Sequence, residues 1–234
     1  MENPLFSFTG LYQIFRWVHY LAGVTWIGHL YYFNFVQGTF FAKTDAQTKS
    51  TAIRQLVPEA LWWFRWGAAF TFLTGVLMLW QQGHIAGHAI YSSSWGVWIL
   101  TGAAMGTLMA YNVWFVIWPA QKVVIASAEA VASGGAADPT AAARGARALM
   151  ASRTNTLFSI PMLFFMGAAS HLGLPLRPES DLVNMSAVIA AILIVLEANA
   201  LFGKKTGPLT TVRGVITSGL LLTVLLYGLI CSLV

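Results

Sequence analysis

The fold is decided by an uncharged stretch near the middle of the chain, residues 95–118, which reads WGVWILTGAAMGTLMAYNVWFVIW. A run of about 20 apolar residues is long enough for a helix to cross the hydrocarbon core of a bilayer. Within the run, Gly102 and Gly106 form a small-x-x-x-small pattern, which lets a second helix pack closely. The stretch therefore predicts a membrane-spanning helix with a tightly packed neighbour.

Five more apolar stretches of similar length flank this one, at residues 11–36, 61–81, 155–174, 183–203 and 211–233. The chain of 234 residues is 57% hydrophobic and only 9% charged, whereas a soluble domain carries about 25% charged residues. We therefore expect an all-α fold, a polytopic bundle of six transmembrane helices. One integral membrane domain over residues 1–234 accounts for the whole chain.

The segment between the third and fourth spans, residues 119–153, has a different composition. It is rich in Ala, Gly and Ser and is interrupted at Ser133, Gly134 and Gly135. Asp138 followed by Pro139 then provides an N-cap and a first-turn proline for a new helix. We expect a cytoplasmic helical hairpin that leads into the fourth span; the alternative is a simple linker.

Lysine and arginine alternate from loop to loop along the chain. Arg177 is the one basic residue in the second and fourth loops, and Arg16 and Arg65 lie within spans. The other basic residues, in or bordering the first, third and fifth loops, are Lys43, Lys49, Arg54, Lys122, Arg144, Arg147, Arg153, Lys204, Lys205 and Arg213. The positive-inside rule then places both termini in the periplasm, with the protein in the bacterial inner membrane. The net charge of +5 is thus assigned to membrane orientation, and no nucleic-acid partner is expected.

Cysteine usage limits the chemistry available to the chain. Cys231 is the single cysteine, so an intrachain disulfide, a thiolate zinc site and a Cys-x-x-Cys-His haem attachment are all excluded. The remaining candidates are ionisable residues within or beside the spans, which are costly in lipid and therefore indicate function.

His19 and His171 lie on different spans at comparable depth on the outer side. Two imidazoles at one depth, with apolar walls, suit the axial ligation of one non-covalent b-type haem in a helix bundle. Gly23, four residues after His19, leaves room beside the helix, and Arg16, one turn before it, can pair with a propionate. His84 is the substitute ligand. The alternative to haem ligation is that each imidazole forms a hydrogen bond with a backbone carbonyl of a neighbouring helix.

Two further histidine patterns are weaker. His84 and His88 form a His-x-x-x-His pair that suits zinc or copper on a helix, but the adjacent glycines weaken the helix. His29 lies about 15 Å deeper than His19, at the level of Glu197, and we expect a buried polar pair between them. This pairing argues against a second bis-histidine haem, and Met166 is a lower-ranked alternative iron ligand.

Four segments resemble a known family. They are residues 17–28 (WVHYLAGVTWIG), 62–67 with 74–75, 112–122 (NVWFVIWPAQK) and 152–166 (SRTNTLFSIPMLFFM). Together they are similar to the membrane domain of the cytochrome-c-linked bacterial urate oxidases, or urate hydroxylases. Family members of demonstrated function end in a soluble cytochrome c domain, whereas this sequence stops at Val234. The resemblance implies a membrane electron-transfer module more firmly than it implies urate chemistry.

Three functions follow as hypotheses. The first is a haem-binding redox protein that passes electrons from a urate-like substrate or a membrane donor to a periplasmic cytochrome c. The second is a non-catalytic accessory subunit of a larger respiratory or oxygenase complex. The third, a transporter with His29 and Glu197 as a proton relay, ranks last because internal repeats are not evident. The expected partners are therefore the bilayer and a cytochrome c or other subunits of a membrane complex.

Overall fold

The computed structural model describes residues 3–177, 179–204 and 206–234. Lys205, one of the basic loop residues, lies outside these ranges. Within them the chain is helical and contains no strand. The long helices are α1 (Phe8–Tyr31), α3 (Ala46–Ala86), α4 (Ser94–Tyr111), α5 (Trp118–Ala132), α6 (Ala141–His171), α7 (Leu182–Phe202) and α8 (Val212–Leu233), and the short elements are η1 (Pro4–Phe6), α2 (Gly38–Lys43), η3 (His88–Ser92) and η5 (Gly207–Thr210).

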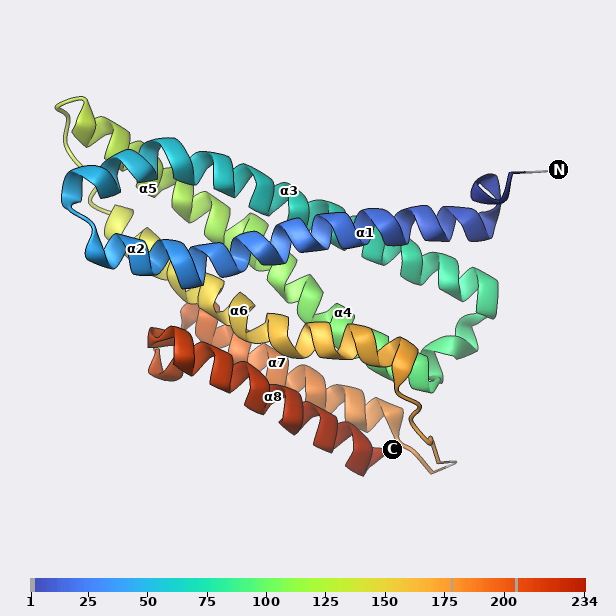
Figure 1. Ribbon diagram of the computed structural model, residues 1–234. Coiled ribbons are helices and arrows are strands. Elements are labelled where there is room, and N and C mark those ends of the chain that lie inside the picture. Colours follow the sequence, from blue (N-terminus) through green and yellow to red (C-terminus); the bar gives the residue numbers. More distant parts are fainter. Residues whose placement is uncertain (1–2, 178, 205) are drawn as a thin grey trace.

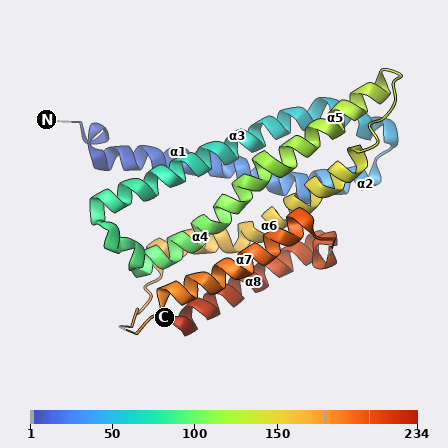
Figure 2. The same cartoon turned by 180° about the vertical axis from the view of Figure 1, so that it is seen from behind.

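The helices lie roughly along one direction and form a single elongated bundle (Figure 1). Helix α1 packs along α3, α4 packs along α6, and α7 and α8 lie together against α6. The connections α2–α3, α5–α6 and α7–α8 gather at one end of the bundle (Figures 1 and 2). Both termini and the connections α3–α4 and α6–α7 lie toward the other end. The loops rich in lysine and arginine therefore share one end.

In the part of the chain that the structure describes, three helical segments are long and apolar enough to cross a membrane. They are Ser94–Ala132, Leu182–Phe202 and Val212–Leu233, and they contain the third, fifth and sixth expected spans. The first expected span is helical through α1 and the π-helical turn that follows it, the second lies in α3, and the fourth lies in α6 as far as His171. The chain is thus an all-helical membrane protein.

Two helices begin well before the spans that they contain. Helix α3 begins after Asp45, whose carboxylate accepts a hydrogen bond from the amide of Thr48 at 2.9 Å. Helix α6 begins at Ala141 and not at Pro139, because Asp138 closes a turn on Thr140 instead of capping a helix. The hydroxyl and then the amide of Thr140 hold the pKa of Asp138 below its usual value.

Glycine residues set the closest helix contacts. A Cβ atom on Gly67 of α3 would lie 3.0 Å from the backbone nitrogen of Trp26 on α1. A Cβ on Gly102 of α4 would lie 3.3 Å from the carbonyl oxygen of Met162 on α6. The close-packing face expected around Gly102 is therefore confirmed.

Two of the long helical paths contain a π-helical turn. These turns are η2 (Tyr32–Gln37), between α1 and α2, and η4 (Asn112–Ile117), between α4 and α5. Each contains an asparagine that is almost fully buried, Asn34 in the first and Asn112 in the second. Because π turns occur frequently at functional sites, these two buried asparagines are candidates for a functional polar cluster.

Candidate functional site

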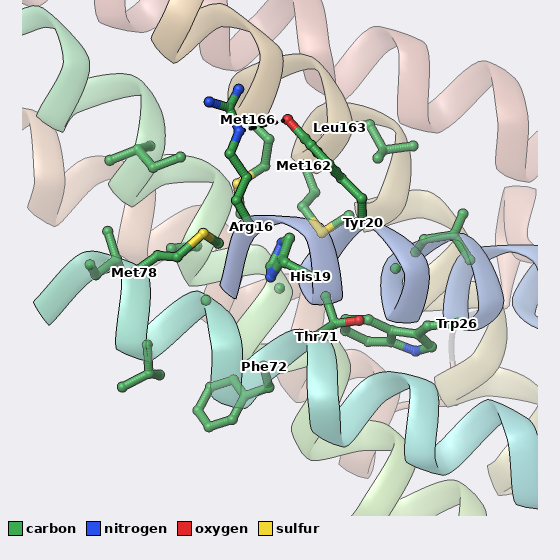
Figure 3. Close-up of a pocket in the computed structure, with 18 of the residues that line it drawn as sticks. Arg16, His19, Tyr20, Trp26, Thr71, Phe72, Met78, Met162, Leu163 and Met166 are labelled. Carbon is green, nitrogen blue, oxygen red and sulfur yellow. Dashed lines mark hydrogen bonds between the residues drawn. The ribbon is translucent and has the colours of Figure 1, made fainter. Parts of the chain in front are cut away.

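A cavity of about 620 Å³ lies between α1, α3, α4 and α6, toward the end of the bundle that holds the termini (Figure 3). Its walls are mainly apolar. Small-molecule and cofactor sites usually occupy about 300–1,000 Å³, with a few polar groups among apolar side chains. The polar groups of this cavity include His19, Arg16 and Thr71.

His19 enters the cavity from α1 with a defined orientation. Its Nδ1 lies 3.2 Å from Oγ1 of Thr74 on α3. The Thr74 hydroxyl donates its own hydrogen to the carbonyl of Phe70 at 2.6 Å, so its oxygen accepts from Nδ1–H of His19. The lone pair of the neutral imidazole then resides on Nε2. Metal-binding histidines are commonly held in this way, with the second ring nitrogen donating to a fixed partner.

Two glycines near His19 have different roles. Gly23 lines the cavity as expected, but a Cβ atom on it would approach Thr71 at 3.9 Å, an ordinary packing distance. Gly75 on α3 is the one that clears space for the ligand candidate, because a Cβ there would lie 3.2 Å from Cε1 of His19. Sequence reasoning missed Gly75, since it lies on another helix, 56 residues away from His19.

Arg16 lies one turn from His19 and also lines the cavity. Its Nε donates to the hydroxyl of Tyr20 at 3.1 Å, and the side chain is exposed. The terminal nitrogens of the guanidinium group keep their hydrogens for an anionic group at the cavity. Arg16 is therefore placed where it can pair with an anionic group in the cavity.

The structure does not bring His171 to the cavity. Gly167 and Ser170 of α6 line it, but the exposed ring of His171 turns away and donates from Nδ1 to the Gly167 carbonyl at 2.9 Å. The expected bis-histidine pair with His19 is therefore not assembled. The alternative to haem ligation is a hydrogen bond to a backbone carbonyl of a neighbouring helix. His171 does bond a carbonyl, but the carbonyl belongs to its own helix.

His84 and His88 are exposed and do not line the cavity either. His84 packs its ring against Trp80 at a centroid distance of 4.6 Å, and His88 lies 6.3 Å from the ring of Tyr91. They belong to different elements, α3 and η3, separated by Gly87 at φ +80°. Among the described residues, no three His, Cys, Asp or Glu side chains form a metal-binding group.

Methionines provide the other possible iron ligands in the cavity. Met78 of α3 and Met162 and Met166 of α6 line the cavity, and Figure 3 shows their side chains around the imidazole of His19. Axial ligation by one histidine and one methionine is a known arrangement for haem iron. The free Nε2 of His19, the thioethers, the apolar walls and Arg16 together fit a b-type haem.

Glu197 and His29 do not form the expected pair. Glu197 of α7 is 5% exposed and accepts a hydrogen bond from Nδ2 of Asn112 at 3.0 Å. His29 instead donates from Nδ1 to the carbonyl of Thr25 at 2.7 Å and lies on the α1 side that faces α3. Glu197 bonds Asn112 of η4, whereas His29 lines a hollow between α1 and α3, so the two side chains lie in different helix interfaces.

A buried polar network surrounds Glu197. Asn112 also donates to Oδ1 of Asn155 at 2.9 Å, and Asn155 donates to the carbonyl of Met109 at 2.9 Å. Asn34, in the other π turn, donates to the hydroxyl of Ser152 at 2.8 Å. Both π-helical turns thus direct a buried amide toward α6, and no feature of the sequence pattern indicates this arrangement.

A family model described as "Urate oxidase N-terminal" matches residues 83–227, which is more than half of the chain. The matched stretch includes the α4 and α6 walls of the cavity and the Asn112–Asn155–Glu197 network. The match begins at residue 83 and therefore excludes α1 and most of α3, where His19, Thr74 and Gly75 lie. No curated protein and no solved structure matches the chain.

Proposed function

Because the chain belongs to the urate oxidase N-terminal family, we propose that it is a redox protein of the bacterial inner membrane that binds one b-type haem. The observation that carries this proposal is the hydrogen bond from Nδ1 of His19 to Thr74, which leaves Nε2 free inside an apolar cavity of about 620 Å³. The residues at the cavity suit a haem held by non-covalent contacts.

The residues around the cavity have separate tasks in this proposal. His19 would hold the iron through Nε2, and Met162 or Met166 would supply a further ligand. Arg16 pairs with a propionate at the rim of the cavity. The apolar walls exclude water from the site, and Thr74 keeps the imidazole in one tautomer and one orientation. When bound, haem supplies reversible one-electron transfer.

The electron donor is a urate-like small molecule, as the family suggests, or a membrane-soluble donor, and the acceptor is a periplasmic cytochrome c. A non-catalytic accessory subunit of a respiratory or oxygenase complex is the alternative. The two differ in whether the purified protein itself carries a redox cofactor.

A reduced-minus-oxidised spectrum of the purified protein tests the proposal. We expect a Soret band and an α-band of b-type haem, extractable into acidified acetone because the haem is not covalently held. Addition of urate, with and without a cytochrome c, shows whether a urate-like substrate reduces the centre. A folded preparation from haem-replete cells without Soret absorption would favour the accessory subunit instead.

The proposed topology has six spans, both termini in the periplasm and the α5–α6 hairpin in the cytoplasm. It is supported by the shared end of the three lysine- and arginine-rich connections (Figures 1 and 2) and by the positive-inside rule. The cavity then lies in the periplasmic half of the membrane, near a periplasmic cytochrome c.

A C-terminal reporter checks the topology. A fluorescent protein that matures only in the cytoplasm should stay dark when fused after Val234, whereas alkaline phosphatase at the same position should be active. The same two reporters inserted at Gly134, in the α5–α6 turn, serve as the matched control and should give the opposite pattern. Bright fluorescence from the C-terminal fusion would reverse the orientation.

A further inference from the structure

A second hollow lies beside the cavity, on the face where α1 and α3 pack together. It is an open groove of about 570 Å³ with a largely apolar lining. Val24 and Gly28 of α1 line both the groove and the cavity, so the two spaces adjoin across one turn of helix. A molecule in the groove would be within electron-transfer reach of the proposed haem.

His29 gives this groove a hydrogen-bond acceptor. Its Nδ1–H is occupied by the Thr25 carbonyl at 2.7 Å, so the lone pair of the neutral ring resides on Nε2. The side chain is half-buried and lines the groove. Nε2 of His29 can therefore accept a hydrogen bond from a hydroxyl group of a ligand.

Glu59 gives the groove a second proton acceptor, this time from α3. Its side chain is exposed, and no hydrogen bond or ion pair joins it to another described residue. Glu59 lies just before the expected second span, at the edge of an apolar groove, where its carboxylate is available to a ligand. Tyr32 and Trp63 add flat aromatic walls to the same groove.

These features select the occupant by its chemistry. An open apolar groove on helices that cross a bilayer is reached from the lipid phase, which favours a molecule with a long apolar tail. Two acceptors, His29 Nε2 and the Glu59 carboxylate, require a headgroup that carries two donors. The carboxylate also repels the phosphate of an anionic phospholipid. A flat ring with two hydroxyl groups and an isoprenoid tail satisfies all of these conditions.

We propose that the α1–α3 groove binds an isoprenoid quinol, with its hydroxyl groups on His29 and Glu59. The inference rests on the proposed function and names its electron donor. Oxidation of one quinol to quinone breaks two O–H bonds, and the two protons pass to Nε2 of His29 and to the carboxylate of Glu59. The two electrons leave in succession and reduce two molecules of the periplasmic cytochrome c.

Binding is tested with a short-chain benzoquinol that carries a diazirine on its tail, kept reduced under argon, and the full-length protein in nanodiscs. Ultraviolet labelling should saturate and map by mass spectrometry to residues 24–32 and 56–63. His29→Ala and Glu59→Gln should each raise the half-saturating concentration about tenfold or more, the effect of one lost hydrogen bond to a polar or charged partner. The matched controls His84→Ala and Glu129→Gln should keep the wild-type value.

Two results would overturn the quinol site: labelling spread over the lipid-facing surface without saturation, or a wild-type half-saturating concentration in both groove variants. Glu59 is exposed, so Glu59→Gln remains informative even if His29→Ala does not fold. The haem spectrum is recorded on the same samples. A wild-type protein without Soret absorption that still shows saturable labelling would remove the proposed function but keep the site. Haem bands without saturable labelling would remove the site alone.

Discussion

His19→Ala should remove the haem absorbance of the purified protein. The imidazole of His19 is the one histidine ring that lines the cavity, and its Nδ1 is engaged by Thr74 at 3.2 Å. Loss of the ring leaves thioethers as the remaining soft ligands, so we expect at least about tenfold less haem per protein, within the range for lost ligands or their supports. The pyridine haemochrome assay measures this ratio directly.

Matched variants separate ligand loss from general damage. His84→Ala and His171→Ala also remove a histidine near the same end of the bundle, but their rings lie outside the cavity, so both should keep the wild-type haem content. Thr74→Val should weaken haem binding about 10- to 100-fold, because it removes the partner that orients His19. Loss of haem in His171→Ala together with full haem in His19→Ala would contradict the assignment.

Glu197→Leu should destabilise the bundle by about 1–2 kcal/mol. The carboxyl group is 5% exposed and bonded to Asn112 at 3.0 Å, and leucine would leave that buried amide short of an acceptor. Hydrogen bonds between membrane helices contribute about 0.6 kcal/mol on average and up to about 1.7. For a chain of this length, the change corresponds to a Tm lower by several degrees, measurable by thermal unfolding in detergent.

The partner of Glu197 can be identified by double-mutant cycles. Glu197→Gln keeps a side-chain oxygen for Asn112 and should cost less than Glu197→Leu. Asn112→Ala and Glu197→Leu should be non-additive, because both remove the same hydrogen bond, whereas His29→Ala and Glu197→Leu should add. Strong coupling with His29 would restore the pair expected from depth alone.

The contrast between Glu197 and His19 shows what the sequence can predict. Apolar length located the three helical segments that can cross a membrane, since the requirement for about 20 residues acts within each segment. Depth along a helix also follows from residue counting, and it correctly placed Arg16 one turn from His19. The side of the helix on which a residue lies, relative to its neighbours, depends on how helices pack. His171 and His29 each donate to a carbonyl of their own helix and do not bond the partners that were expected from depth.

The residues that were missed act across helices or depend on irregular turns. Gly75 and Thr74 lie on α3 and support a histidine on α1, and a single sequence does not reveal that the two helices adjoin. Asn155 of α6 is fully buried and bonded to Asn112. That bond depends on the π turn at residues 112–117, which no periodic pattern predicts.

The π turn in η4 also determines how the residues that follow it are rotated about the helix axis. A π turn takes in one residue more than an α-helical turn, and each residue of an α-helix advances the side chains by about 100°. Trp118, just beyond the turn, places its ring 3.9 Å from the guanidinium of Arg65 on α3. Without the extra residue, everything from Trp118 to the α5–α6 turn would rotate by roughly that angle and lose this stack. The extra residue in η4 thus sets the direction in which the side chains of α5 face.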